Sequence, residues 1–312
     1  MFKRRVNEAE IEIAISPETP LLIKAGDTGA DPTQPDMEFV RTYHASGETI
    51  YLPGSSLKGA VRAHAERIVR TVGGTAPGPS IWSCNPLDER STCRTMSKDC
   101  SAEVAYRESC AICKMFGSTE IASHYTSGDA YPEGPVTLEE RNGVAIDRVY
   151  GSVAVGPFNY QVATQGRFVT TLRMVNFSLD QLGLLALTLR DFSKQRVSLG
   201  FGKSRGLGQV ALDIRKVTLR YPGSILEGST IKALGRKISF DGSKVAGAGS
   251  LFAEARDYGF PVPDLVEARA TPAPEDLGLA VTQSFTGDDL TALWQACVQQ
   301  WRVRLEEGVT AR

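Results

Sequence analysis

The segment LGFGKSRGLGQV, residues 199–210, sets a Lys-Ser-Arg tripeptide (203–205) among four glycines. A P-loop needs the pattern G-x-x-x-x-G-K-[ST], followed by a helix that points its N–H groups at the phosphates. Here the residue five before Gly202 is Val197, and Arg205 breaks the alternative pattern G-x-G-x-x-G. A helix is expected before the loop and a strand after it, so the segment argues against ATP binding. Its exposed backbone amides and its cations instead suit the phosphates of a nucleic-acid backbone.

The hydrophobic pattern around this loop predicts an α+β, ferredoxin-like (RRM-like) fold. Apolar residues alternate with period two, as in strands, in residues 10–15 and 209–221, the latter with one irregularity, and residues 167–175 are also expected to form a strand. A helix is expected to begin at an N-cap of Ser55 or Ser56, and a second helix over 180–195. The order strand, helix, further strands, helix, strand fits an α+β core with long insertions better than a doubly wound sheet.

The composition is that of a soluble globular protein with an uneven charge distribution. The chain has 312 residues, 42% of them hydrophobic and 23% charged, and a net charge of −1. Residues 190–220 contain eight Lys/Arg and two Asp/Glu, whereas residues 251–312 contain five and ten. Such asymmetry suits a basic face for a polyanion, although charges scattered over a solvated surface remain an alternative. No apolar run suits a signal peptide or a membrane span, so a cytoplasmic location is expected.

Five cysteines fall within thirty residues and indicate a metal site. Cys110 and Cys113 have the C-x₂-C spacing of a zinc knuckle. We expect structural Zn²⁺ on Cys84, Cys93, Cys110 and Cys113, with Cys100 as the alternate ligand. Four thiolates leave no open position for catalysis, and the metal would staple a segment that has few large apolar residues. Unligated thiols and redox chemistry are the alternatives, and Cys297 is expected to pack as a small apolar residue.

Two motifs, YLPGSSLKGAVR (51–62) and GFGKSRGLGQV (200–210), resemble the paired glycine signatures of the RAMP superfamily, the RNA-binding proteins of CRISPR effector complexes. Three more stretches are similar to the backbone subunit of type III effectors, of subtype III-D or III-E: AGDTGADPTQPDMEFVR (25–41), AIDRVYGSVAVGPF (145–158) and CAICKMFGS (110–118). The resemblance covers about residues 9–221.

This resemblance implies a domain organisation and a set of partners. The implied RNA-binding core spans residues 1–221, with a zinc-knuckle insertion at 73–115 and a thumb hairpin at 139–166. Residues 222–312 lie outside the resemblance and are expected to form a C-terminal extension that ends in an amphipathic helix. The implied partners are crRNA, complementary target RNA and other subunits of a CRISPR effector complex, with no membrane.

The final helix is expected to be capped by Asp288 or Asp289. Its apolar face contains Leu290, Leu293, Trp294, Cys297, Trp301 and Leu305. This face is expected to pack on the parent domain, and a docking face for a neighbouring subunit is the alternative.

The resemblance also assigns residues to RNA binding. Those assigned are Ser55, Ser56, Lys58, Arg62, Arg148, Gly202, Lys203, Ser204 and Arg205. Their hydroxyls, helix N-terminal amides and cations suit backbone phosphate. In the thumb, Tyr150, Phe158 and Tyr160 are candidates to contact bases, with ordinary hairpin packing as the alternative.

The resemblance also implies that target RNA is cleaved at a carboxylate of the first loop, with Mg²⁺ or Mn²⁺. Alignment from the Pro-Gly-Ser-Ser turn makes Asp36 the candidate catalytic residue, with Asp27 and Asp31 as alternates. The family pattern after this position differs from Met37-Glu38-Phe39 here. A non-catalytic crRNA scaffold is therefore a second hypothesis.

A third hypothesis is an endonuclease that processes precursor crRNA, which would need a general-base histidine. The candidates are His44, His64 and His124. Neither His44 nor His64 is in a recognisable catalytic setting, and a surface or packing role is the alternative for each histidine.

Overall fold

The structure is a computed structural model. It describes residues 3–26, 35–45, 47–75, 77, 81–88, 92–93 and 100–310, without the side chains of 308–310. In this described part, no helix combines the length and the apolar character that crossing a membrane requires.

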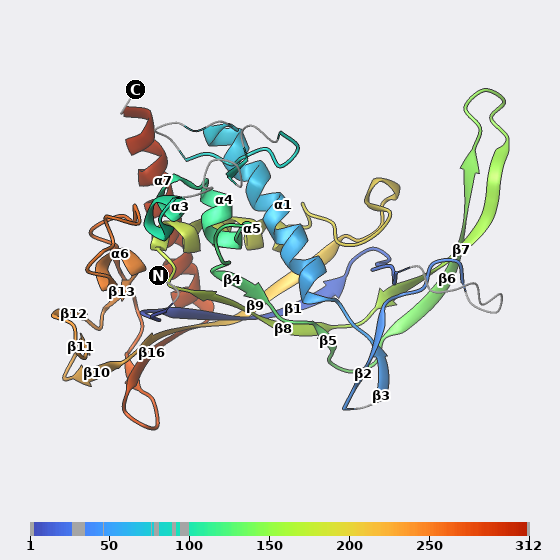
Figure 1. Cartoon of the computed structure of the whole chain (residues 1–312). Helices are drawn as coiled ribbons and strands as arrows, with labels where there is room; N and C mark the ends of the chain where they lie inside the picture. Colours follow the sequence, from blue (N-terminus) through green and yellow to red (C-terminus); the bar gives the residue numbers. More distant parts are fainter. Residues whose placement is uncertain are drawn as a thin grey trace.

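A central antiparallel sheet organises the molecule (Figure 1). Its core elements follow one another as strand, helix, strand, strand, helix, strand: β1 (Glu8–Pro17), α1 (Gly54–Gly73), β4 (Tyr125–Ser127), β8 (Phe168–Val175), α5 (Leu179–Ser193) and β9 (Val210–Pro222). In space the strands lie in the order β9-β1-β8-β4, and each is antiparallel to its neighbour. This is a ferredoxin-like topology, so the α+β class predicted from the sequence is confirmed.

The central strand β1 has a buried face and an outer face. Ile11, Ile13 and Ile15 are buried, as the period-two pattern requires. Pairing with β9 shifts register between Glu12 and Ile13, which is the irregularity expected for the last strand. On the outer face, Glu10 lies opposite Arg173 and binds it at 2.8 Å.

Helix α1 begins at Gly54, two residues earlier than a cap at Ser55 would allow. Pro53 is its N-cap residue and makes no side-chain capping hydrogen bond, so the predicted caps Ser55 and Ser56 are wrong. The first turn is fixed instead by close packing, since a Cβ on Gly54 would lie 2.2 Å from the carbonyl oxygen of Ser127.

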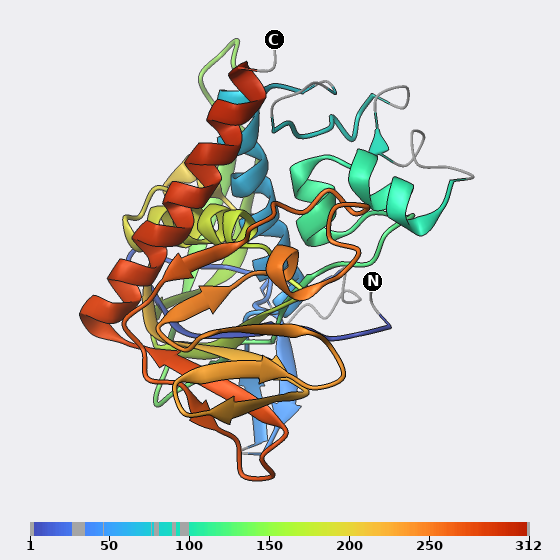
Figure 2. The same cartoon turned by 90° about the vertical axis from the view of Figure 1, so that its left-hand side faces the viewer.

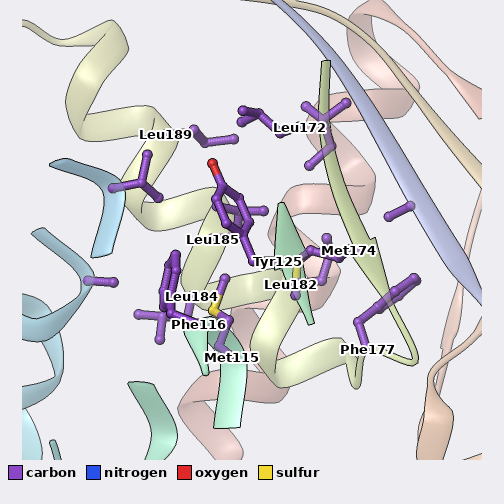
Figure 3. Packing of buried hydrophobic residues seen from close by; sticks show 14 of the residues in the cluster. Met115, Phe116, Tyr125, Leu172, Met174, Phe177, Leu182, Leu184, Leu185 and Leu189 are labelled. Atoms are coloured by element: carbon purple, nitrogen blue, oxygen red, sulfur yellow. The ribbon is translucent and has the colours of Figure 1, made fainter. Parts of the chain in front are cut away.

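The helices lie together on one side of the sheet (Figures 1 and 2). The segment between α1 and β4 contains two short helices, α3 (Ala102–Glu108) and α4 (Ala111–Phe116). Met115 and Phe116 of α4 lie among the leucines of α5 and beside Tyr125 (Figure 3). The cysteine-bearing segment is therefore part of the main core.

Two hairpins leave the core. The small one joins β2 (Arg41–His44) to β3 (Gly47–Ile50). The large one joins β6 (Thr137–Ile146) to β7 (Val153–Gln165) and projects far beyond the sheet (Figure 1). It occupies the segment expected to form the thumb. A short strand, β5 (Tyr131–Pro132), precedes it and pairs with β8.

Beyond β9 the chain adds small sheets and then returns to the core. The elements are β10 (Ser224–Glu227), β11 (Thr230–Ala233), β12 (Ile238–Asp241), β13 (Lys244–Ala246), α6 (Ala248–Leu251), β14 (Leu265–Glu267), β15 (Ala273–Pro274), β16 (Ala280–Phe285) and α7 (Gly287–Thr310). Strand β16 pairs with β9 and extends the central sheet. The division at residue 221 stays a prediction, and the segment after it is packed on the sheet.

The terminal helix α7 packs on α5. Leu290, Leu293, Cys297 and Trp301 are buried, so packing on the same chain, the first of the two expectations, describes this face. A Cβ on Gly183 of α5 would lie 2.2 Å from the carbonyl oxygen of Cys297, which shows how closely the backbones approach. The helix begins at Gly287, so Asp288 and Asp289 lie in its first turn and do not cap it.

Candidate nucleic-acid interface and metal centre

The glycine-rich loop is a compact turn between α5 and β9. Gly200, Gly202, Gly206 and Gly208 all have positive φ, between 72° and 82°, a region that other residues adopt only with strain. The loop closes where the N–H of Leu199 donates to the carbonyl oxygen of Gly208 at 2.8 Å. A strand follows it, so the helix N-terminus that a P-loop needs is not there.

The loop also docks on the segment after β1. The N–H of Phe201 donates to the carbonyl of Leu22 at 2.7 Å, and that of Gly208 donates to Pro20 at 2.9 Å. An added Cβ would not fit at Gly200, where it would lie 2.1 Å from the carbonyl oxygen of Leu22, or at Gly208, where it would lie 2.0 Å from that of Leu199. The backbone contacts thus fix the loop and leave its tip outward.

Lys203, Ser204 and Arg205 form that tip as one exposed turn of 3₁₀ helix, labelled η1. Half of the basic residues in 190–220 are paired with acids: Arg190, Arg196, Arg215 and Arg220. Within the described part of the chain, Lys203 and Arg205 have no ion-pair partner. These two cations are therefore available to a polyanion.

Arg205 lies against two aromatic rings. Its guanidinium carbon is 5.7 Å from the centre of the Phe201 ring and 5.8 Å from that of Phe158. Cation–π contacts of this kind hold an arginine in place without neutralising it. Because Phe158 belongs to β7, the loop is joined to the root of the projecting hairpin.

Asp36 also contacts β7, next to Phe158. Its Oδ2 accepts a hydrogen bond of 2.8 Å from the N–H of Asn159, and Met37 bridges to Tyr160 of β7. The side chain of Asp36 is exposed. Asp36 and Arg205 therefore contact consecutive residues of β7. The alternates Asp27 and Asp31 lie outside the described residues.

The turn before α1 has an acidic neighbour that the sequence did not indicate. The N–H of Gly54 donates to Oδ1 of Asp129 at 2.7 Å. Ser55 is exposed and Ser56 half-buried. A carboxylate thus occupies part of the helix N-terminus that was expected to meet phosphate.

Lys58 and Arg62 point from α1 to the cysteine-bearing segment. Lys58 Nζ donates to Ser123 Oγ at 2.8 Å, and burial together with nearby Arg62 lowers the pKa of Lys58. Arg62 donates to the carbonyl of Gly117 at 3.1 Å and lies 3.8 Å from Cys113 Sγ. The structure gives both cations a packing role, and their contact with RNA stays a prediction.

Arg148 lies in the turn that joins β6 to β7, at the far end of the projecting hairpin (Figure 1). The tip is tied by Asp147, whose Oδ1 accepts hydrogen bonds from the N–H groups of Val149 and Tyr150. Tyr150 is 85% exposed and Val149 80%. The tip combines one cation with apolar side chains that contact little else.

The four cysteines predicted as ligands form one buried cluster. The sulfur atoms of Cys84, Cys93, Cys110 and Cys113 all lie within 4.8 Å of one another, so the set can bind a metal ion such as zinc. Backbone N–H groups point at two of the sulfurs, from Cys110 to Cys93 at 3.2 Å and from Cys113 to Cys110 at 3.3 Å. Cys100 is exposed and outside the cluster.

The chemistry of the thiols fits a cation among them. A hydrogen bond with Cys110 lowers the pKa of Cys84, whereas a hydrogen bond with Cys110 raises the pKa of Cys113. Thiols this close cannot all ionise unless a cation offsets their charges. The nearby guanidinium of Arg62 supplies part of that compensation.

The three histidines lie in different settings. His64 Nε2 is 2.8 Å from Asp191 Oδ2, inside a cluster that includes Arg190 and Arg196. His124 is buried, and burial lowers its pKa to about 4. His44 is exposed and its ring stacks on that of Tyr131. The described structure does not bring any two of them together around one exposed site.

Sequence reasoning missed three contacts of this region. They are the hydrogen bond from Gly54 to Asp129, the approach of Arg62 to Cys113, and the ring stack at His44. Each joins residues that are far apart in sequence, and no local motif encodes such a pair.

A family model of the RAMP superfamily matches residues 14–211. The chain belongs to the RAMP superfamily. The matched range runs from β1 to the start of β9 and contains the glycine-rich loop, the cysteine cluster and both hairpins of this RAMP protein. Membership of the superfamily suggests a CRISPR-associated, RNA-binding role. No curated protein matches the sequence significantly.

Proposed function

We propose that this RAMP protein is a backbone subunit of a type III CRISPR effector complex, of subtype III-D or III-E, that binds crRNA. One observation carries the proposal. The exposed Lys203–Arg205 turn and the exposed Asp36 meet consecutive residues at the root of the β6–β7 hairpin. Cations and a carboxylate at one junction suit an RNA backbone that is both held and presented for reaction.

The proposed binding of RNA by this turn does not depend on base sequence. Lys203 and Arg205 offer charge to phosphate oxygens, and the hydroxyl and amides of the turn offer hydrogen bonds. In RNA-guided systems specificity is delegated to base pairing between guide and target. A protein that contacts the backbone of the guide is consistent with target selection by base pairing.

The cysteine cluster serves this function as a structural zinc centre. Four thiolates fill a tetrahedral shell, so no position is left for a reacting water. Arg62 and Lys58 tie the cluster's segment to α1, while α4 packs on α5. The metal would hold together the helical layer that supports the RNA-binding loops.

Cleavage of target RNA at Asp36 is the finer part of the proposal. The hydrogen bond from Asn159 orients the carboxylate, and its other oxygen has no hydrogen bond within the described residues. Mg²⁺ binds through one or two carboxylates together with substrate phosphates, so Asp36 fits such an ion. When bound, the ion would offset the negative charge that develops on the phosphate. Asp36 itself would hold the ion or accept the proton of the attacking 2′-hydroxyl.

The decisive experiment compares the guide-loaded complex with its Asp36→Asn variant. Asparagine can still accept the hydrogen bond from Asn159, so the hairpin root keeps its geometry while the charge is removed. We expect one target-RNA cut to disappear and target binding to persist. Unchanged cleavage by Asp36→Asn would leave this chain as a crRNA scaffold without catalysis.

The processing-endonuclease hypothesis has a separate test. The isolated chain is incubated with precursor repeat RNA. Specific cutting that needs His44, His64 or His124 would overturn both the scaffold hypothesis and the proposal that this chain cleaves target RNA. We expect none, because the described structure does not bring these histidines together.

A further inference from the structure

Three aromatic rings form a column beside the turn that opens α1. The rings of His44 and Tyr131 are 4.2 Å apart between centres with 26° between their planes. Tyr51 and Tyr131 follow at 6.0 Å and 17°. The three rings are therefore nearly parallel, with Tyr131 common to both contacts.

Backbone pairing builds this column. Leu52 and Ala130 form an antiparallel bridge, and each donates a hydrogen bond to the other, at 2.9 and 2.8 Å. The neighbouring residues Tyr51 and Tyr131 are thereby set opposite each other. His44 comes from the end of β2, so three separate segments supply the rings.

One end of the column is open to solvent. His44 is exposed, whereas Tyr51 and Tyr131 are half-buried. Open rings with parallel faces resemble the stacking platforms on which proteins hold unpaired bases.

The column adjoins the proposed RNA path. Tyr51 lies two residues before Pro53, and Tyr131 lies two residues after Asp129, which binds Gly54 at the start of α1. The same β2 strand is linked to the hairpin root, where Arg41 donates to Gln161 of β7 at 3.4 Å. The rings thus adjoin the turn that opens α1, and β2, which carries His44, is bonded to β7, the strand that binds Asp36.

We propose that the exposed face of His44, backed by Tyr131 and Tyr51, stacks one unpaired nucleobase of the bound RNA. This inference rests on the proposed RNA-binding function and adds a site for a base to contacts that otherwise address only phosphates. A nucleobase suits the column because it is planar and can continue the stack on the open imidazole face.

The test is binding of a fluorescent single-stranded RNA to the full chain, measured at several salt concentrations. His44→Ala should weaken binding about tenfold. The slope of log affinity against log salt should not change, because a stacked base carries no phosphate charge. His44→Phe restores a ring and should restore most of the affinity. In duplex RNA of the same sequence the bases are already stacked. His44→Ala and His44→Phe should therefore bind the duplex with equal affinity.

Tyr43→Ala is the matched control. Tyr43 precedes His44 in β2, is 83% exposed and points to the opposite face of the strand. An equal loss of affinity in Tyr43→Ala and His44→Ala would overturn the inference, since the stack would not be the cause. The inference would also be overturned if His44→Ala bound RNA with unchanged affinity but lost self-association of the chain. The rings would then form a contact between proteins.

The two levels of proposal fail differently. If the wild-type chain binds RNA through Lys203 and Arg205 while His44→Ala binds equally well, the stacking site is wrong and the proposed function stands. If the wild-type chain binds no RNA, both are wrong.

Discussion

The carboxylate of Asp129 accepts a hydrogen bond of 2.7 Å from the N–H of Gly54, the first residue of α1. This contact stabilises the helix start and also places a negative charge where RNA phosphate is proposed to bind. The negative charge of Asp129 should therefore stabilise the helix and weaken the binding of RNA.

Asp129→Asn should change helix stability and RNA affinity in opposite directions. The amide oxygen can still accept the hydrogen bond from Gly54, but the charge is lost. We expect a loss of about 0.5 kcal/mol in the free energy of unfolding, from the weaker interaction with the helix dipole. RNA affinity at low salt should rise severalfold. Denaturation curves and RNA titrations measure the two effects, and a fall in RNA affinity would contradict this account of the turn.

Lys203 and Arg205 make a prediction about salt. If each contacts one phosphate of single-stranded RNA, replacing both by alanine should reduce the slope of log affinity against log salt by about 1.4. The matched control is Arg215→Ala, which removes a cation already paired with Glu133. Titrations at several salt concentrations give the slopes, and equal slopes for the double variant and the wild type would contradict the assignment.

Metal content and stability should depend on the clustered cysteines only. We expect about one zinc per chain by elemental analysis. Cys113→Ser should lower both the zinc content and the melting temperature, because the ion holds the segment between α1 and β4 together. Cys100→Ser is the control, since Cys100 lies outside the cluster. An equal loss of zinc in both variants would count against the four-ligand site.

Two glycines of the loop should differ in their tolerance of alanine. Gly206 and Gly208 have nearly the same φ, 79° and 82°. A Cβ on Gly206 meets nothing within 4 Å, whereas one on Gly208 would lie 2.0 Å from the carbonyl oxygen of Leu199. Gly206→Ala should cost about 1–2 kcal/mol for the left-handed backbone alone. Gly208→Ala should cost clearly more, and chemical denaturation of both variants checks the order.

Asp264 should make stability fall as pH rises. Burial, together with nearby Asp180, raises the pKa of Asp264 to about 7. The folded state therefore holds a proton that the unfolded chain releases near pH 4. The stabilisation from this group is complete below about pH 4 and is lost as pH rises through about 7.

The measurement is the difference between the unfolding free energies of wild type and Asp264→Asn across this pH range. Its total change should be on the order of 4 kcal/mol. The difference is needed because His124, with its pKa lowered to about 4, contributes the opposite slope between about pH 6.5 and 4. A difference that does not vary with pH would contradict the assignment.

The sequence predicts best where the information is local. Period-two alternation located β1 and β9, and the C-x₂-C spacing selected Cys110 and Cys113 for the cluster. Cys84 and Cys93 were also chosen in agreement with the structure, whereas Cys100 was held only in reserve.

Failures occurred where distant packing decides the outcome. Ser55 and Ser56 are favourable caps by residue type, but close contact between Gly54 and Ser127 begins the helix earlier. Asp129 gave no signal, because its role depends on the fold that brings it to Gly54.

The central place of β1 has a consequence for how the chain is made. Its partners are β8 and β9, which end at residues 175 and 222. On the ribosome, a nascent chain therefore carries an apolar strand with both edges open until most of the protein has been synthesised. Pairings of such long sequence separation form slowly, and open strands invite association with other chains. Efficient production of this protein should depend on what shields Ile11, Ile13 and Ile15 during that interval.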